Sequence, residues 1–412
     1  MKEVLMMINP GKEERTNFNK ITTEFLEKLN AKLKDAKVIL GGSGAKDTWL
    51  SGNHDIDLFV QYDYKKYSSE SEHLSELLEK TLKKTFPKVE INKLHGSRDY
   101  FQLTYKKLNF EVVPIIKISK SEDALNITDI SPLHAIWVNK NTKDKKDDIR
   151  LVKQLCRANK LYGAESYISG FSGYILEILI AHYGSFEKLL KASEKWKDKE
   201  VVDPEKHYKN KAMVMFNLNT SKLQSPLIIV DPVDQNRNAA AALSLEKFML
   251  FKKVAKSYLK KPSATFFTKK EIDLEQLNKE KGNLVYVKVI PLEGKGDVVG
   301  VKLLKAFEFL EKEFKPFGVK KSDWDWDREK KAVFYYILEK DKLPDYDLRK
   351  GPPLKLEDFV KDFKKKNKDT FVKEGKLYAK IKVEYPLLKD FVNDLIKQKY
   401  FKEKVKKIEL II

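Results

Sequence analysis

The part of the sequence that decides the fold is Gly41-Gly-Ser-Gly-Ala-Lys-Asp-Thr-Trp-Leu-Ser-Gly-Asn-His-Asp-Ile-Asp57. Directly before it, the apolar run of residues 37–40 predicts a short strand that ends at the glycines. At its other end, residues 54–60 alternate polar and apolar side chains, as a half-buried strand does. The stretch is therefore expected to join two strands through a glycine turn.

Three acidic residues suggest the chemistry of this region. Asp55 and Asp57 are two residues apart on the predicted strand, so their side chains project from one face while Ile56 and Leu58 point to the other. Two carboxylates held this close repel unless a cation lies between them, and oxygen ligands suit Mg²⁺. If the later strand that carries Glu111 pairs beside the first, the cluster can hold two metal ions. Such a pair activates an attacking hydroxyl and stabilises a leaving group.

The glycine turn offers a place for a phosphate group. Gly42 and Ser43 supply backbone N–H groups and a hydroxyl, and a helix is expected to begin at Gly44-Ala-Lys46. A Gly-Gly-Ser turn alone is more often an ordinary loop, and an Asp-x-Asp pair alone is usually a solvated strand. The combination of turn, paired acids and a later acidic strand favours metal-dependent phosphate chemistry.

The amino-acid composition indicates which class of partner the protein binds. Lysine and arginine number 81 against 61 acidic residues, and the resulting net charge of +20 attracts polyanions such as nucleic acid. Cys156 is the one cysteine, which excludes an intrachain disulfide and a zinc site built on several cysteines. The N-terminus lacks the apolar stretch of a signal peptide, and no apolar run is long enough to cross a membrane. We expect a cytoplasmic protein with no membrane partner.

The spacing of apolar residues predicts an α+β multidomain chain. Residues 1–140 mix helical and strand-like segments, residues 141–259 are mainly helical, and residues 260–412 return to α/β patterning. Helices are expected at residues 17–35, 74–82, 149–160, 173–183, 301–314, 356–366 and 387–397. Further strands are expected at residues 89–94, 100–105, 109–118, 284–290, 332–338 and 376–383.

Several of these segments resemble one known family. The glycine turn followed by Asp-x-Asp resembles the DNA polymerase β nucleotidyltransferase superfamily, and the fuller string from Gly41 to Gly52 is similar to the archaeal-type (class I) CCA-adding enzymes. Segments that look like the same family, in its order and across nearly the whole chain, are Ser131-Pro-Leu-His134, Leu161-Tyr-Gly-Ala-Glu165, Gly170-Phe-Ser-Gly-Tyr174, Asp231-Pro-Val-Asp-Gln-Asn-Arg-Asn-Ala-Ala-Ala241, Lys261-Pro-Ser263 and Gly351-Pro-Pro353.

The resemblance implies an architecture and an activity. A polymerase-β-like nucleotidyltransferase domain would span residues 1–140, a helical central domain completing the nucleotide pocket residues 141–259, and a tRNA-binding body and tail residues 260–412. The activity would be template-independent addition of C, C and A to the 3′ end of tRNA from CTP and ATP, with two Mg²⁺ ions and release of pyrophosphate. The oligomeric state stays open, a homodimer included.

Residue roles follow from the same resemblance. Metal binding and catalysis fall to Asp55, Asp57 and Glu111, and nucleotide binding to Ser43, Lys46, His134, Lys153, Tyr162 and Arg237. Within the second group Arg237 would take part in base choice, and His134 would contact the sugar or a phosphate. The lysines within residues 361–368 and 402–407 would follow the acceptor stem or the TΨC arm.

Other interpretations stay open for these residues. His134 could be a structural histidine, Arg237 could pair with Asp231 or Asp234, and Lys153 could lie on a solvated helix face. Tyr162 and Tyr174 could equally be aromatic residues of the core. The runs of lysines could be solvated faces. For the whole chain, the rivals are a poly(A) polymerase-like enzyme and a non-catalytic tRNA-binding protein.

The chain also departs from the family pattern. Asp55 stands where many members carry Glu, and Glu111 where Asp is usual, so each keeps the charge and alters the reach by one methylene. Ile130 precedes Ser131 where an arginine is common. Arg98-Asp-Tyr-Phe101 replaces a His-Pro-Tyr-type string that would wall the nucleotide pocket.

Overall fold

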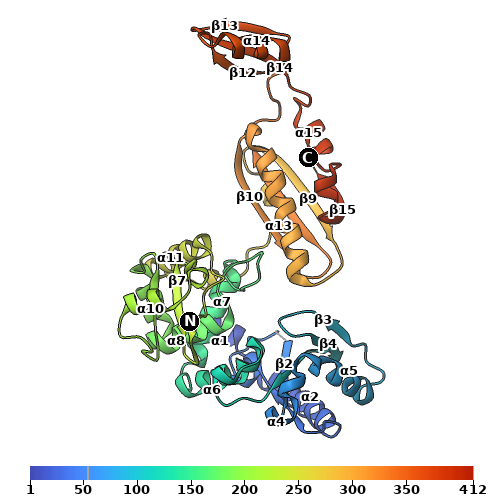
Figure 1. Ribbon diagram of the computed structural model, residues 1–412, viewed down its shortest axis with the longest axis vertical. Coiled ribbons are helices and arrows are strands. Elements are labelled where there is room, and N and C mark those ends of the chain that lie inside the picture. Colours follow the sequence, from blue (N-terminus) through green and yellow to red (C-terminus); the bar gives the residue numbers. More distant parts are fainter. Residues whose placement is uncertain (53–54, 412) are drawn as a thin grey trace. The chain divides into compact units, whose positions relative to one another are not determined.

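The computed structural model describes residues 1–52 and 55–411, and the chain forms two compact units, Met1–Lys270 and Glu271–Ile412 (Figure 1). His54, where the sequence places the start of the acidic strand, lies outside the described residues. The three domain ranges expected from the sequence stay a prediction. In the part of the chain that the structure describes, no helix is long and apolar enough to span a membrane.

A five-stranded sheet organises the first part of the N-terminal unit. Its strands are β1 (Ala36–Leu40), β2 (Asp55–Tyr62), β3 (Asn92–Leu94), β4 (Tyr100–Tyr105) and β5 (Leu108–Ile116), in the order β1-β2-β5-β4-β3. Strand β2 runs parallel to β5, and the other neighbours are antiparallel. The accompanying helices are α1 (Lys2–Ile8), α2 (Lys12–Asn30), α3 (Gly42–Ala45), α4 (Tyr64–Tyr67) and α5 (Leu74–Thr85).

The alternation predicted for the acidic strand sets the two faces of this sheet. Ile56 and Leu58 of β2 are buried with Phe110 of β5 in one core, which also takes the apolar stripes of α2 and α5 (Figure 1). Phe25 of α2 stacks on Phe110, with ring centroids 4.2 Å apart. Because side chains alternate along a strand, Asp55 and Asp57 project from the opposite face.

The rest of the N-terminal unit is mainly helical, as predicted, around a separate core. Its helices are α6 (Ser131–Asn141), α7 (Lys146–Ala158), α8 (Gly173–Tyr183), α9 (Phe186–Glu194), α10 (Lys211–Asn217) and α11 (Leu245–Lys260). It also contains a small sheet of β6 (Glu200–Val202), β7 (Leu227–Asp231) and β8 (Asp234–Asn238) that the helical interpretation missed. The predicted bounds of residues 173–183 match α8.

The C-terminal unit contains two antiparallel sheets. The strands β9 (Asn283–Pro291), β10 (Val319–Trp326), β11 (Ala332–Leu338) and β15 (Val405–Ile411) form the first, in the order β10-β11-β9-β15. The strands β12 (Tyr346–Pro353), β13 (Thr370–Lys373) and β14 (Lys376–Lys382) form the second. The helices are α12 (Leu274–Leu277), α13 (Gly296–Glu313), α14 (Glu357–Lys366), α15 (Leu388–Leu395) and α16 (Lys399–Lys402).

Candidate active site

The acidic strands pair as the sequence analysis expected. In the parallel β2–β5 pair, Asp55 lies opposite Asn109 and Asp57 lies opposite Glu111. Residues that pair directly across two strands point to the same face of the sheet. The backbone therefore brings Asp55, Asp57 and Glu111 to one face of two adjacent strands, away from the core.

The close approach of the glycine turn gives Asp57 an unusual environment. The N–H of Gly41 donates to the carbonyl oxygen of Asp57 at 2.7 Å. A Cβ atom at Gly42 would lie 1.6 Å from the Asp57 Oδ2 atom, so only glycine fits there. Burial raises the pKa of Asp57 above the usual carboxylate value, and Asp55 raises it further, whereas the charges of Lys46 and Lys153 act in the opposite direction.

The three carboxylates fit a hard cation by their chemistry. Across residues 1–52 and 55–411, no three histidine, cysteine, aspartate or glutamate side chains lie close enough together, as placed, to hold a metal ion. Glu111 instead accepts a hydrogen bond from the Gln102 Nε2 atom at 3.3 Å. The donors are nevertheless all carboxylate oxygens on one face, and a divalent cation relieves the repulsion between Asp55 and Asp57.

The glycine turn differs in detail from the prediction. The helix expected to begin at Gly44-Ala-Lys46 instead begins at Gly42 and spans Gly42–Ala45 as α3, and Lys46 follows it. The turn closes earlier because Gly42 adopts a left-handed backbone with φ of 52°, a conformation that glycine takes at no steric cost. Ser43 lies within α3, and its carbonyl oxygen accepts the N–H of Thr48 at 3.0 Å. Lys46 and Ser43 thus lie on one short segment beside Asp57.

A buried glutamate holds both of the lysines predicted to contact a triphosphate. Glu177 of α8 is fully buried, and its Oε2 atom lies 2.6 Å from the Lys46 Nζ atom. Its Oε1 atom lies 2.7 Å from the Lys153 Nζ atom and accepts the Thr48 hydroxyl at 2.7 Å. Burial alone would raise the pKa of Glu177, but the charges of Lys153 and Lys46 outweigh it and lower this pKa to about 2.

Lys153 is therefore not on a solvated helix face, the alternative that the sequence left open. Its side chain is buried, and its ammonium group donates to Glu177, to the Thr48 hydroxyl at 2.8 Å and to the Thr48 carbonyl at 3.3 Å. An ammonium group has three protons, so these contacts use all of them.

A second buried carboxylate gathers the other predicted nucleotide contacts. Asp231, at the end of β7, forms an ion pair with Arg237, and its Oδ2 atom lies 3.2 Å from the His134 Nε2 atom. Its Oδ1 atom accepts the Tyr174 hydroxyl at 3.0 Å. Burial would raise the pKa of Asp231, but His134 and Arg237 outweigh it and lower this pKa to about 2. Arg237 thus makes the pairing with Asp231 that the sequence offered as an alternative.

Aromatic rings lie near these two carboxylates, among them those of the predicted contacts His134 and Tyr162. The rings of His134 and Tyr174 are stacked with centroids 4.1 Å apart, and the Lys46 Nζ atom lies 5.9 Å from the centre of the Tyr174 ring. The Arg157 guanidinium lies over the Tyr162 ring at 4.9 Å. A Cβ atom at Gly173 would lie 2.9 Å from the Tyr162 hydroxyl oxygen, so the start of α8 passes directly beside this ring.

Sequence reasoning missed Glu177 and overlooked what Asp231 does. Glu177 is the one charged side chain in the first six residues of α8, where five of the six are apolar or glycine. A lone carboxylate in such a helix signals a buried, paired charge. Asp231 was quoted as part of a family segment and as a partner for Arg237, yet its contacts with His134 and Tyr174 required the fold.

Two departures from the family pattern have structural roles. Arg98 is buried and donates to the Asp129 Oδ1 atom at 2.5 Å and to the Pro114 carbonyl at 3.1 Å. Ile130, which follows Asp129 in the sequence, is also buried. These residues stabilise the end of β5.

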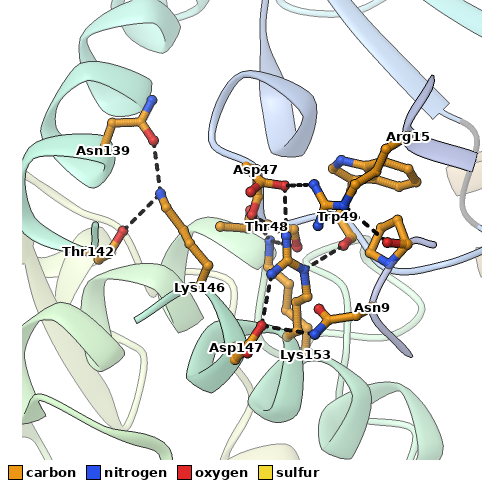
Figure 2. Close-up of polar contacts among 12 residues, drawn as sticks. Asn9, Arg15, Asp47, Thr48, Trp49, Asn139, Thr142, Lys146, Asp147 and Lys153 are labelled. Carbon is orange, nitrogen blue, oxygen red and sulfur yellow. Dashed lines mark hydrogen bonds and ion pairs between the residues drawn. The ribbon is translucent and has the colours of Figure 1, made fainter. Parts of the chain in front are cut away.

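A buried arginine, Arg150, anchors the segment that follows the glycine turn. Figure 2 labels the residues of that segment, Asp47, Thr48 and Trp49. Arg150 of α7 donates to the carbonyl oxygens of Asp47 at 2.6 Å and Trp49 at 3.1 Å. It also pairs with the carboxylates of Asp47 at 2.8 Å and Asp147 at 3.1 Å. Arg15 reaches the same Asp47 carboxylate at 2.7 Å. Helix α7 therefore holds residues 47–49 through one planar guanidinium, a geometry that lysine cannot reproduce.

Replacing Arg150 with methionine is expected to lower the free energy of unfolding by about 3 kcal/mol, because two buried carbonyl groups lose their donors. Arg15→Met is the matched control: this side chain is about one-third exposed, and an exposed pair contributes under about 1 kcal/mol. Urea titrations of both variants measure the difference. Equal losses for the two substitutions would contradict the anchoring role.

The fold is shared with known nucleotidyltransferases. The family model for a nucleotidyltransferase domain matches residues 22–134. The solved structure of Cid1, described with RNA terminal uridylyl transferase activity, has a TM-score of 0.51 at 14% identity and covers 66% of this chain and 97% of its own. A second Cid1 structure, with Mg 3′-dATP bound, has a TM-score of 0.50 at 15% identity and covers 65% of this chain and 97% of its own. The fold and the paired acidic strands define a nucleotidyltransferase of the polymerase β type.

Comparison with related sequences identifies the family. The chain is 38% identical to the CCA-adding enzyme of Nanoarchaeum equitans over 83% of each chain, and 30% identical to that of Pyrococcus abyssi over 97% of this chain and 90% of the relative. The family models for the tRNA nucleotidyltransferase second domain and the CCA-adding enzyme C-terminal domain match residues 147–268 and 302–408. The chain belongs to the family of CCA-adding enzymes.

Proposed function

We propose that this chain adds and repairs the 3′-terminal CCA of tRNA, using CTP and ATP and releasing pyrophosphate. The observation that carries the proposal is the in-register parallel pairing of Asp57 with Glu111 beside the glycine turn, in a chain of this family. In the reaction, the 3′ oxygen of the tRNA forms a bond to the α-phosphorus of the nucleotide, and the bond to pyrophosphate breaks.

The acidic face provides the metal ligands of the proposal. Asp55, Asp57 and Glu111 would hold Mg²⁺, which when bound activates an attacking hydroxyl and neutralises charge on a leaving pyrophosphate. Asp55 is one methylene shorter and Glu111 one methylene longer than the usual family residues, so each keeps the negative charge and alters the reach of its carboxylate.

The chain's own groups bind and orient the triphosphate. Lys46, Ser43 and Tyr162 line the segment beside Asp57 and the start of α8. Lys153 contributes positive charge from α7, where its contacts with Glu177 and Thr48 hold it. Because phosphoryl transfer asks little covalent chemistry of the protein, fixed positive charge and in-line positioning supply most of the rate.

Base choice falls to Arg237 in this proposal. CTP and ATP share an exocyclic amino group and a ring acceptor, and a guanidinium with a fixed orientation presents donors at a defined distance. Asp231 supplies that orientation through its ion pair, and the Arg237 side chain remains about one-third exposed. His134, stacked on Tyr174 and held by the same carboxylate, would contact the sugar or a phosphate.

The C-terminal unit would bind the tRNA backbone. Helix α14 and the segment just after its end present exposed lysines at positions 361, 364, 365, 366 and 368, and Lys402 and Lys407 are exposed as well. Lysines contact phosphates without reading base sequence, which suits an enzyme that must accept every tRNA. The acceptor stem and the TΨC arm are the proposed contact regions.

Incubation of tRNA transcripts that lack CCA with CTP, ATP and Mg²⁺ is expected to lengthen them by three nucleotides. ATP alone should extend only transcripts that already end in CC, and by one residue. Electrophoresis at single-nucleotide resolution reads both results. Long tails from ATP alone would indicate a poly(A) polymerase-like enzyme. Binding of tRNA without any extension would indicate a non-catalytic protein.

A further inference from the structure

The contacts of Glu177 link three separate segments of the N-terminal unit. Its carboxylate joins Lys46 and Thr48, from the loop after α3, to Lys153 of α7, while Glu177 itself belongs to α8. All four side chains are buried, with Glu177 and Thr48 fully inaccessible to solvent. A carboxylate with this many buried partners costs desolvation energy that its contacts must offset, so its place among them is closely defined.

The charges around Glu177 are arranged asymmetrically. Lys46 and Lys153 contribute two positive charges against one negative charge, and Arg150, Arg157 and Lys146 of α7 add further positive charge nearby. The acidic group of β2 that interacts with the two lysines is that of Asp57, which also has Asp55 as a charged neighbour. The phenol groups of Tyr162 and Tyr174 complete the surroundings, and burial raises the pKa of both.

Without Glu177, this surplus of positive charge would act on the lysines themselves. A buried ammonium group with no carboxylate partner loses its proton readily, because burial and neighbouring cations both disfavour the charged form. Lys153 is buried and has two arginines nearby, so it depends on Glu177 to stay charged. Lys46 pairs with the other oxygen of the same carboxylate.

We propose that Glu177 is a positioning residue for the triphosphate of CTP and ATP, which keeps Lys46 and Lys153 charged and in place beside the glycine turn. The inference rests on the proposed function and adds a residue to it. Glu177 does not contact the nucleotide; it acts through the two lysines. Its effect is on the phosphates, so it is the same for CTP, ATP and pyrophosphate, whatever the base.

The test compares Glu177→Gln with the unmodified full-length chain. The glutamine keeps the shape and the hydrogen bond from Thr48 but removes the charge. We expect the KM for CTP to rise about 5-fold near pH 6.5 and about 30-fold or more near pH 9, since the buried Lys153 without its carboxylate partner loses its proton as the pH rises. The value of kcat at saturating CTP should change less than about 3-fold, because the chemistry at the acidic face is untouched.

Three controls separate positioning from a general loss of structure. Glu187→Gln makes the same chemical change at an exposed position of α9 and should leave the KM unchanged at every pH. The inhibition constant of pyrophosphate and the KM for ATP should rise by the same factor as the KM for CTP. Equilibrium dialysis with CTP in the absence of tRNA gives the same comparison even if the chain extends no tRNA, so failure of the proposed function is seen separately.

A KM ratio that is the same at all pH values, or below about 2-fold throughout, would overturn the proposal. If Glu177→Gln fails to fold, Thr48→Val decides instead, because it removes only the hydroxyl shared by Glu177 and Lys153. It should weaken CTP binding about 3-fold, as expected for one lost hydrogen bond. Unchanged CTP binding in that variant would equally overturn the proposal.

Discussion

Replacing Asp57 with alanine is expected to lower the rate of nucleotide addition by at least about 1,000-fold, because the substitution removes a carboxylate that we propose as a ligand of the catalytic metals. Asp57 is flanked by Asp55 on its own strand and lies in register with Glu111 on β5, so neither neighbour can take its place without moving a strand. Single-turnover addition of C to a tRNA transcript lacking CCA measures the rate.

Asp35→Asn is the matched control for this substitution. Asp35 is an exposed aspartate next to the strand that pairs with β2, and its surface ion pair with Lys66 contributes little to stability. Its backbone has a positive φ of 51°, which asparagine tolerates. The control should retain full activity. A rate for Asp57→Ala within about 10-fold of the control would refute the catalytic assignment of the acidic face.

Gly42→Ala should reduce the rate of addition by at least about 100-fold, since a displacement of about 1 Å at a reacting group costs that much. The added Cβ atom would meet the Asp57 carboxylate at 1.6 Å, so either the turn or the carboxylate must move. Both carry groups assigned to the reaction, namely Ser43 on the turn and Asp57 on the strand.

Gly52→Ala separates the steric effect from the backbone effect. Gly52 also has a positive φ, of 76°, but a Cβ atom there would meet nothing within 4 Å. Both variants should therefore lose about 1 kcal/mol of folding free energy from the left-handed backbone, and Gly42→Ala alone should lose activity. Chemical denaturation and the single-turnover rate are measured on both. Equal rates in the two variants would show that the contact with Asp57 is unimportant.

Regular elements were predictable wherever the pattern was local. The helix predicted at residues 173–183 and the strands predicted at residues 100–105 and 332–338 match α8, β4 and β11. The interpretation missed the small sheet for a different reason at each strand. Strand β6 has only three residues, β7 is a continuous apolar run that periodicity cannot distinguish from a buried helix, and β8 contains no apolar residue.

The site residues also divide into those that a local sequence pattern could place and those whose roles required the fold. The placement of Asp55, Asp57 and Glu111 on one face needed only strand alternation and the guess that two acidic strands pair, and the register confirms that pairing. The roles of Lys46 and Lys153 could not be separated in the sequence, where both are ordinary lysines among many. Their contacts distinguish them, because Lys153 uses all three of its protons on Glu177 and Thr48, whereas Lys46 donates to the other carboxylate oxygen of Glu177.

The sequence by itself determined the glycine turn, the acidic strands and the family, because each depends on residues close together in the chain or on a series of motifs in order. Only the tertiary structure decided that Glu177 holds Lys46 and Lys153, and that Asp231 holds His134, Tyr174 and Arg237. These partners are separated by up to 131 residues, and an ion pair depends on distance and dielectric, which arise only when the segments pack.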